Sequence, residues 1–92
     1  MIALTSHPRR REDILKQRAA EDFVLFNLEN GQYYALDEVG GRIWECCDGT
    51  CPVSEIISLL CQEYEAPAAT IQADVIELLE DLAHENLVVL EP

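Results

Sequence analysis

The chain has 92 residues, 49% hydrophobic and 26% charged, a composition typical of one small globular domain and not of a disordered segment. Its 18 acidic and 6 basic residues give a formal net charge of −12, and residues 19–92 hold one base, Arg42, against sixteen acids. An acidic body repels phosphate, so we expect no binding to nucleic acid. No apolar run is long enough to cross a bilayer, and no signal-peptide core opens the chain. We therefore expect a cytoplasmic protein that does not bind a membrane.

The first thirteen residues, which include Arg9, Arg10 and Arg11, predict a flexible basic N-terminal arm. Residues 14–92 predict one folded domain, which begins with strands. A short strand is expected over residues 14–18, and the run Asp22 to Leu28 is a stronger one because it is rich in residues that suit a pleated surface. Asn30-Gly31 predicts a type I′ hairpin turn, and residues 32–36 then form the partner strand.

From Asp37 onward the spacing of apolar residues becomes helical. Asp37 is a good N-cap for a first helix that ends at Asp48-Gly49, and Pro52 suits the start of a second. A third helix is expected from about Ala68 to Glu85, ended by Asn86 in a left-handed conformation. An extended tail over residues 87–90 closes the chain.

The order of these elements predicts the fold class. It is α+β and winged helix-turn-helix-like, with a three-stranded antiparallel sheet followed by three helices. Such a sheet has two edges, and each edge carries unpaired N–H and C=O groups that must be covered or used. The apolar stripe of the third helix is wider than one packing surface needs, because Ile76 and Ala83 stand to one side of it.

The sequence gives little support for catalysis or metal binding. The four cysteines, Cys46, Cys47, Cys51 and Cys61, form no CxxC pair, and neither zinc-finger nor iron–sulfur spacing is met. Acidic neighbours make a nucleophilic cysteine unfavourable, and no glycine-rich phosphate loop is present. We therefore expect no enzyme activity, no metal and no cofactor; the cysteines on helices are interpreted as small core residues.

One stretch resembles a known family. Gly31-Gln32-Tyr33-Tyr34-Ala35-Leu36, followed by Gly40-Gly41-Arg42-Ile43-Trp44 and by the segment Ala73-Asp74-Val75, is similar to the PqqD family. The similarity extends over roughly residues 14–90. Members are recognition elements for ribosomally synthesised and post-translationally modified peptides (RiPPs). They bind the leader segment of a precursor peptide as an added antiparallel strand at the edge of the third strand, beside the third helix.

The resemblance implies a non-catalytic peptide chaperone with a defined binding site. Backbone pairing would supply affinity and side-chain pockets specificity. If the acids of the third helix border the groove, the leader is expected to carry Lys or Arg near its apolar anchors. The peptide-binding residues implied are Gln32, Tyr33, Tyr34, Ala35, Leu36, Asp74, Ile76, Leu79, Glu80 and Ala83.

The resemblance leaves the pathway and the partners open. The partner enzyme is either a radical-SAM enzyme or, in lasso peptide biosynthesis, a leader peptidase with a lactam-forming cyclase. The alternatives are a dedicated role in pyrroloquinoline quinone biosynthesis and a winged-helix DNA-binding regulator. A free edge also permits either a monomer or a strand-exchanged dimer. Alternation places one of Tyr33 and Tyr34 inward and the other outward, without indicating which.

Overall fold

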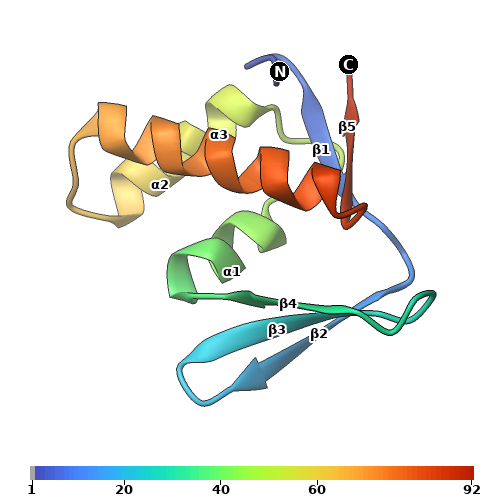
Figure 1. Cartoon of the computed structure of the whole chain (residues 1–92). Coiled ribbons are helices and arrows are strands. Elements are labelled where there is room, and N and C mark those ends of the chain that lie inside the picture. The colour runs from blue at the N-terminus through green and yellow to red at the C-terminus, as the bar shows by residue number, and fades with distance from the viewer. Residues whose placement is uncertain (1) are drawn as a thin grey trace.

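A computed structural model describes residues 2–92 (Figure 1). It contains a three-stranded antiparallel sheet, three helices and a second, two-stranded sheet, so the predicted order of three strands and three helices is confirmed. The elements are β1 (His7–Arg10), β2 (Ile14–Ala19), β3 (Asp22–Asn27), β4 (Tyr33–Leu36), α1 (Glu38–Glu45), α2 (Val53–Glu63), α3 (Ala68–His84) and β5 (Val88–Glu91).

The three-stranded sheet has the order β2-β3-β4. A two-residue turn joins β2 to β3, with Ala20 at a φ of 58°. The predicted hairpin between β3 and β4 is present, but its turn is not type I′, which requires a positive φ at both central residues. Only Gly31 has one, at 75°, and the loop is longer, closed by a 2.8 Å hydrogen bond from the Asn27 N–H to the Gln32 carbonyl.

Local signals end the helices largely as predicted. Asp37 caps α1: its Oδ1 accepts a 2.7 Å hydrogen bond from the backbone N–H of Gly40. Pro52 is the N-cap of α2, so the helix itself begins at Val53 and not at Pro52 as expected. Asn86 has a φ of 60° immediately after α3, and this left-handed residue turns the chain into β5.

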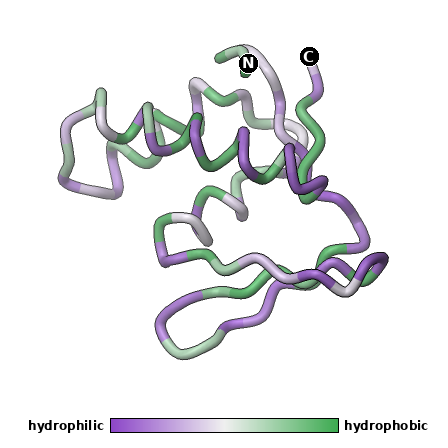
Figure 2. Tube along the Cα trace, in the orientation of Figure 1, coloured by the Kyte–Doolittle hydropathy of each residue, from purple (hydrophilic) through white to green (hydrophobic). Residues whose placement is uncertain are grey.

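The core lies between the sheet and the helices, and α1 occupies the middle layer. Figure 1 shows α1 between the three-stranded sheet and the pair formed by α2 and α3. Hydrophobic and hydrophilic segments alternate along α3 in Figure 2, as one-sided burial requires. Because α1 separates β4 from α3, these two elements leave an open space beside the first turn of α1. The buried side chains include Leu25, Leu36, Ile43, Trp44, Cys47, Val53, Ile56, Leu60, Val75, Leu79 and Leu82.

The predicted flexible arm over residues 1–13 does not fit residues 7–10, which form β1. This strand pairs with β5 in antiparallel register, from His7 opposite Glu91 to Arg10 opposite Val88. Its other side is also held, since the Arg10 N–H donates to the Cys47 carbonyl at 2.9 Å and the Gly49 N–H donates to the Pro8 carbonyl at 2.9 Å. Long-range pairing, which the local sequence does not reveal, therefore fixes this basic segment against the domain.

The remaining sequence expectations concern membranes, metals and cysteines. None of the helices within residues 2–92 is long and apolar enough to cross a membrane. No group of three or more His, Cys, Asp or Glu side chains in that range is arranged to hold a metal ion. Cys46 and Cys47 are buried in the core as predicted, whereas Cys51 and Cys61 are partly exposed.

Candidate functional site

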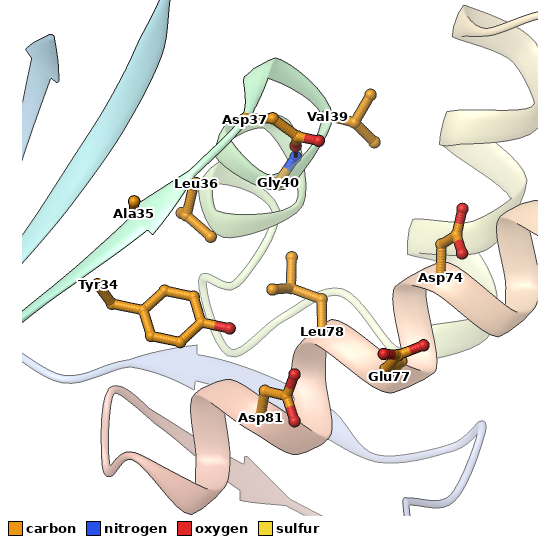
Figure 3. Close-up of a pocket in the computed structure, with 10 residues that line it drawn as sticks. All are labelled: Tyr34, Ala35, Leu36, Asp37, Val39, Gly40, Asp74, Glu77, Leu78 and Asp81. Carbon is orange, nitrogen blue, oxygen red and sulfur yellow. Dashed lines mark hydrogen bonds between the residues drawn. The ribbon is translucent and has the colours of Figure 1, made fainter.

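A groove lies between β4 and α3, which we call the β4–α3 groove. Its volume is about 480 Å³. Figure 3 shows Tyr34 reaching across it from β4 toward α3, with Leu78 opposite. The groove exists because α1 holds the sheet away from α3, and the first turn of α1 closes its far end. Its lining residues are Tyr34, Ala35, Leu36, Asp37, Val39, Gly40, Asp74, Glu77, Leu78 and Asp81.

One wall of the groove is the unpaired edge of β4. Within residues 2–92, β3 is the only strand that pairs with β4. The Asn27 N–H donates to the Gln32 carbonyl, and Phe26 lies opposite Tyr33 in the same register. Because hydrogen-bonded and non-hydrogen-bonded pairs alternate in an antiparallel ladder, Tyr34 and Leu36 direct their backbone groups toward β3. Tyr33 and Ala35 consequently direct their N–H and C=O groups to the free edge.

The other wall is acidic. Asp74, Glu77 and Asp81 extend from α3, Asp37 stands at the end of β4, and no lysine or arginine is among the residues that line the groove. Partial burial, followed by the negative charges of Asp81, Glu85 and Glu77, raises the pKa of the Tyr34 hydroxyl above its ordinary value. Tyr34 is therefore a neutral phenol at physiological pH, able to donate a hydrogen bond into an electronegative hollow.

The two adjacent tyrosines of β4 have different environments. Tyr34 is half-buried and directed into the groove, as Figure 3 shows. Tyr33 lies on the outward face of the sheet, where 71% of its surface is exposed and its ring stacks on Phe26. The inward tyrosine, left undetermined by the sequence, is therefore Tyr34.

The structure brings only part of the predicted site together. Tyr34, Ala35, Leu36 and Asp74 line the β4–α3 groove. Gln32 and Tyr33 border a much smaller hollow of about 20 Å³, next to Glu85 and Leu87. Six residues that line the groove are not among the peptide-binding residues that the resemblance implies, namely Asp37, Val39, Gly40, Glu77, Leu78 and Asp81.

The other predicted residues of α3 do not line the groove. Leu79 is fully buried in the core, and Ala83 packs against the core. Ile76 and Glu80 border an adjoining depression on α3, which shares Glu77 with the groove. Residues 74, 77, 78 and 81 follow the spacing i, i+3, i+4, i+7, so they form one face of the helix, and Ile76 and Glu80 lie on a different one.

Comparison with known proteins identifies a family and relatives. The family model described as coenzyme PQQ synthesis protein D (PqqD) matches residues 22–88. A protein of Rhodopseudomonas palustris named PqqA binding protein is 38% identical over 80 residues, which cover 87% of this chain and 72% of that protein. A protein of the same name from Xanthomonas axonopodis pv. citri is 34% identical over 88 residues, 94% of each chain.

Two solved structures share the fold, and both proteins carry a bound peptide. TbiB1 in complex with the TbiA(beta) leader peptide superposes with a TM-score of 0.75 at 29% identity, over 87% of this chain and 93% of that one. Lasso peptide synthetase B1 complexed with the leader peptide gives a TM-score of 0.78 at 19% identity, over 90% of this chain and 98% of that one. The second likeness concerns the fold alone.

Proposed function

This chain belongs to the PqqD family, and from that premise we propose that it binds the leader segment of a ribosomally synthesised precursor peptide and presents the peptide to a modifying enzyme. The observation that carries the proposal is the unpaired edge of β4 beside an acidic groove. The relatives named PqqA binding protein support it, as does the leader-bound TbiB1 at 29% identity.

We propose that the peptide binds as a fourth strand, antiparallel to β4. The N–H and C=O groups of Tyr33 and Ala35 are directed to the free edge, so they offer two donors and two acceptors to an incoming strand. Backbone pairing of this kind supplies affinity that does not depend on the peptide's sequence. Tyr34 and Leu36 already use their backbone groups toward β3 and act through their side chains.

Specificity would come from the side chains that enter the groove. Tyr34 and Leu78 offer an apolar surface, and Asp74, Glu77 and Asp81 surround it with negative charge. A leader with Lys or Arg next to an apolar anchor complements both features. An acidic leader would meet like charges instead, so the groove selects against it as well.

The domain contributes delivery and no chemistry of its own. Capturing the leader raises the local concentration of the rest of the precursor at an enzyme that the domain contacts, which makes the next encounter effectively intramolecular. The partner we propose is a radical-SAM enzyme, or a leader peptidase acting with a lactam-forming cyclase. Each of them would act on the segment that follows the leader, outside the groove.

Titration of the ¹⁵N-labelled protein with synthetic leaders tests this function. The probes are PqqA, the TbiA(beta) leader and the leader encoded by any short reading frame beside this gene, with a random DNA duplex as the negative control. We expect at least one leader to shift the amides of residues 33–36 and 74–81, and the duplex to shift none.

Hydrogen exchange in the same samples tests the strand-addition geometry. Bound peptide should slow exchange of the Tyr33 and Ala35 amides, whereas the Tyr34 and Leu36 amides are already protected by β3. Saturating amounts of all the leaders with no shift would contradict the proposed function. Shifts confined to other parts of the chain would contradict the assignment of the site.

A further inference from the structure

A row of exposed apolar side chains crosses the outward face of the three-stranded sheet and ends at the edge of β4. Leu15 of β2 lies opposite Phe26 of β3, and Phe26 lies opposite Tyr33 of β4. Their exposed fractions are 45%, 41% and 71%, respectively. The Phe26 and Tyr33 rings stack with centroids 6.3 Å apart and planes inclined by 25°. Tyr33 therefore has an aromatic neighbour on one side and the open edge on the other.

We infer that an apolar side chain of the bound peptide extends this row beyond Tyr33, so that the peptide is recognised on both faces of its strand. The inference rests on the proposed strand addition to β4. The position is fixed by the ladder: the peptide residue opposite Tyr33 points its side chain to the same face as Tyr33, because directly paired residues share a face.

The geometry defines an alternating recognition pattern. The peptide residues opposite Tyr33 and Ala35 face outward, and only the first meets an aromatic ring. The residue between them, opposite Tyr34, faces the groove, where Figure 3 shows Asp81 close to the Tyr34 hydroxyl. The fitting peptide therefore carries a basic or apolar side chain facing inward and an aromatic or large aliphatic side chain immediately beside it, facing outward.

The continuity of the row argues for this occupant. Tyr33 ends this row of three, so without a further neighbour the outer side of its ring stays in water, and a peptide strand at the ordinary interstrand spacing places one side chain against that side. A single peptide strand contacts both the groove and the row, because its side chains alternate between the two faces of the sheet. Backbone pairing with β4 therefore positions peptide side chains against both surfaces.

Selection from a displayed library of random twelve-residue peptides tests the inference without knowledge of the natural precursor. Binders selected on the wild-type protein are measured by fluorescence anisotropy on Tyr33→Thr, which keeps a residue that favours strands and removes the ring. We expect affinity to fall about threefold to tenfold, the range of an aromatic pair contact. Replacing the aromatic outward residue of the peptide by serine should cost no further affinity on this variant.

Leu15→Thr is the matched control, since it removes another exposed apolar side chain of the same row. β2 is two strands from β4, so Leu15 lies roughly 14 Å from an added strand and its loss should leave affinity unchanged. Equal effects of both variants would overturn the inference by indicating a general weakening of the sheet. Far-ultraviolet circular dichroism of both variants confirms that they are folded.

Two further outcomes separate the inference from the function on which it rests. Peptides that bind wild type and Tyr33→Thr equally, and that shift the amides of Tyr34 and Asp81, would overturn the outward contact and leave strand addition standing. The row would then be free for another macromolecule. If the library yields no binder and none of the leaders shifts any amide in the titration above, both the outward contact and the proposed leader binding are overturned.

Discussion

Gly41 is the point at which α1 rests on Phe23 of β3, and we predict that Gly41→Ala destabilises the fold although alanine is the better helix former. A Cβ atom at Gly41 would lie 2.4 and 2.6 Å from two carbon atoms of the Phe23 ring. Carbon atoms that are not bonded approach to about 3.5–4 Å, so helix and ring must separate by about 1 Å. The ring is confined, because it packs against the hydrophobic core and the Lys16 Nζ lies 4.6 Å from its centroid.

Two opposing terms decide the result. Alanine gains about 1 kcal/mol of helix propensity over glycine, whereas overpacking costs about 1–3 kcal/mol. Because both contacts are far inside van der Waals range, we expect the steric cost to lie at the upper end, for a net loss of about 1–2 kcal/mol. Urea unfolding measures it conveniently, since Trp44 is the single tryptophan, is buried and belongs to α1 itself.

A second substitution isolates the contact. Phe23→Leu shortens the side chain, so Gly41→Ala should cost less in that background than in wild type. Gly41→Ala with an unchanged or raised unfolding free energy would refute the steric argument and show that helix propensity decides. Gly41→Ala should also weaken leader binding, because a displaced α1 moves Gly40 and Asp37, which line the groove.

Three further predictions concern the groove and the core. Asp81→Asn should weaken binding of a lysine-containing leader about twofold to fivefold and reduce the salt dependence of that binding. Glu80→Gln, on the same helix but outside the groove, should change neither the affinity nor its salt dependence. Anisotropy titrations of both variants at low and high salt measure these effects. Ala35→Pro removes an edge N–H without breaking a ladder bond to β3, so leader affinity should fall at least about tenfold while the melting temperature, read by circular dichroism, stays within a few degrees. Burial raises the pKa of the Cys47 thiol to about 12 from an ordinary 9. The protonated thiol therefore stabilises the fold below about pH 9, and this contribution is lost as the pH rises toward 12. In urea titrations over that pH range, Cys47→Ala should lose less unfolding free energy than the wild-type protein.

Much of the fold follows from local signals, and the hairpin shows why. β3 and β4 are adjacent in the chain, rich in aromatic and β-branched residues, and joined by a loop in which Gly31 supplies the positive φ. The caps at Asp37 and Asn86 are equally local. β1 was missed because its partner β5 is some eighty residues away and no local pattern distinguishes its four residues from a polar arm.

The site was predicted less completely, for a reason that lies in the geometry of α3. The core stripe of Ile71, Val75, Leu79 and Leu82 leaves two flanks of the helix, and the sequence does not say which one faces β4. The apolar side chains of Ile76 and Ala83 favour one flank, whereas the groove lies on the acidic flank, whose Asp74, Glu77 and Asp81 are equally typical of a solvated surface. The sequence held a signal in the i, i+3, i+7 spacing of these acids, but only the packing of α1 assigns it to a groove.

The β1–β5 ladder has a topological consequence. Since His7 lies opposite Glu91, the polypeptide enters and leaves the domain at neighbouring points, and none of the residues that line the groove belongs to either strand. A domain built this way can be spliced into a surface loop of a host enzyme, or circularly permuted, through two short joints on the side of the β1–β5 ladder. In such a fusion the groove would have a fixed distance and orientation relative to the catalytic cleft of the host enzyme. The covalent joints would then hold domain and enzyme together, so no binding affinity between two separate chains would be needed.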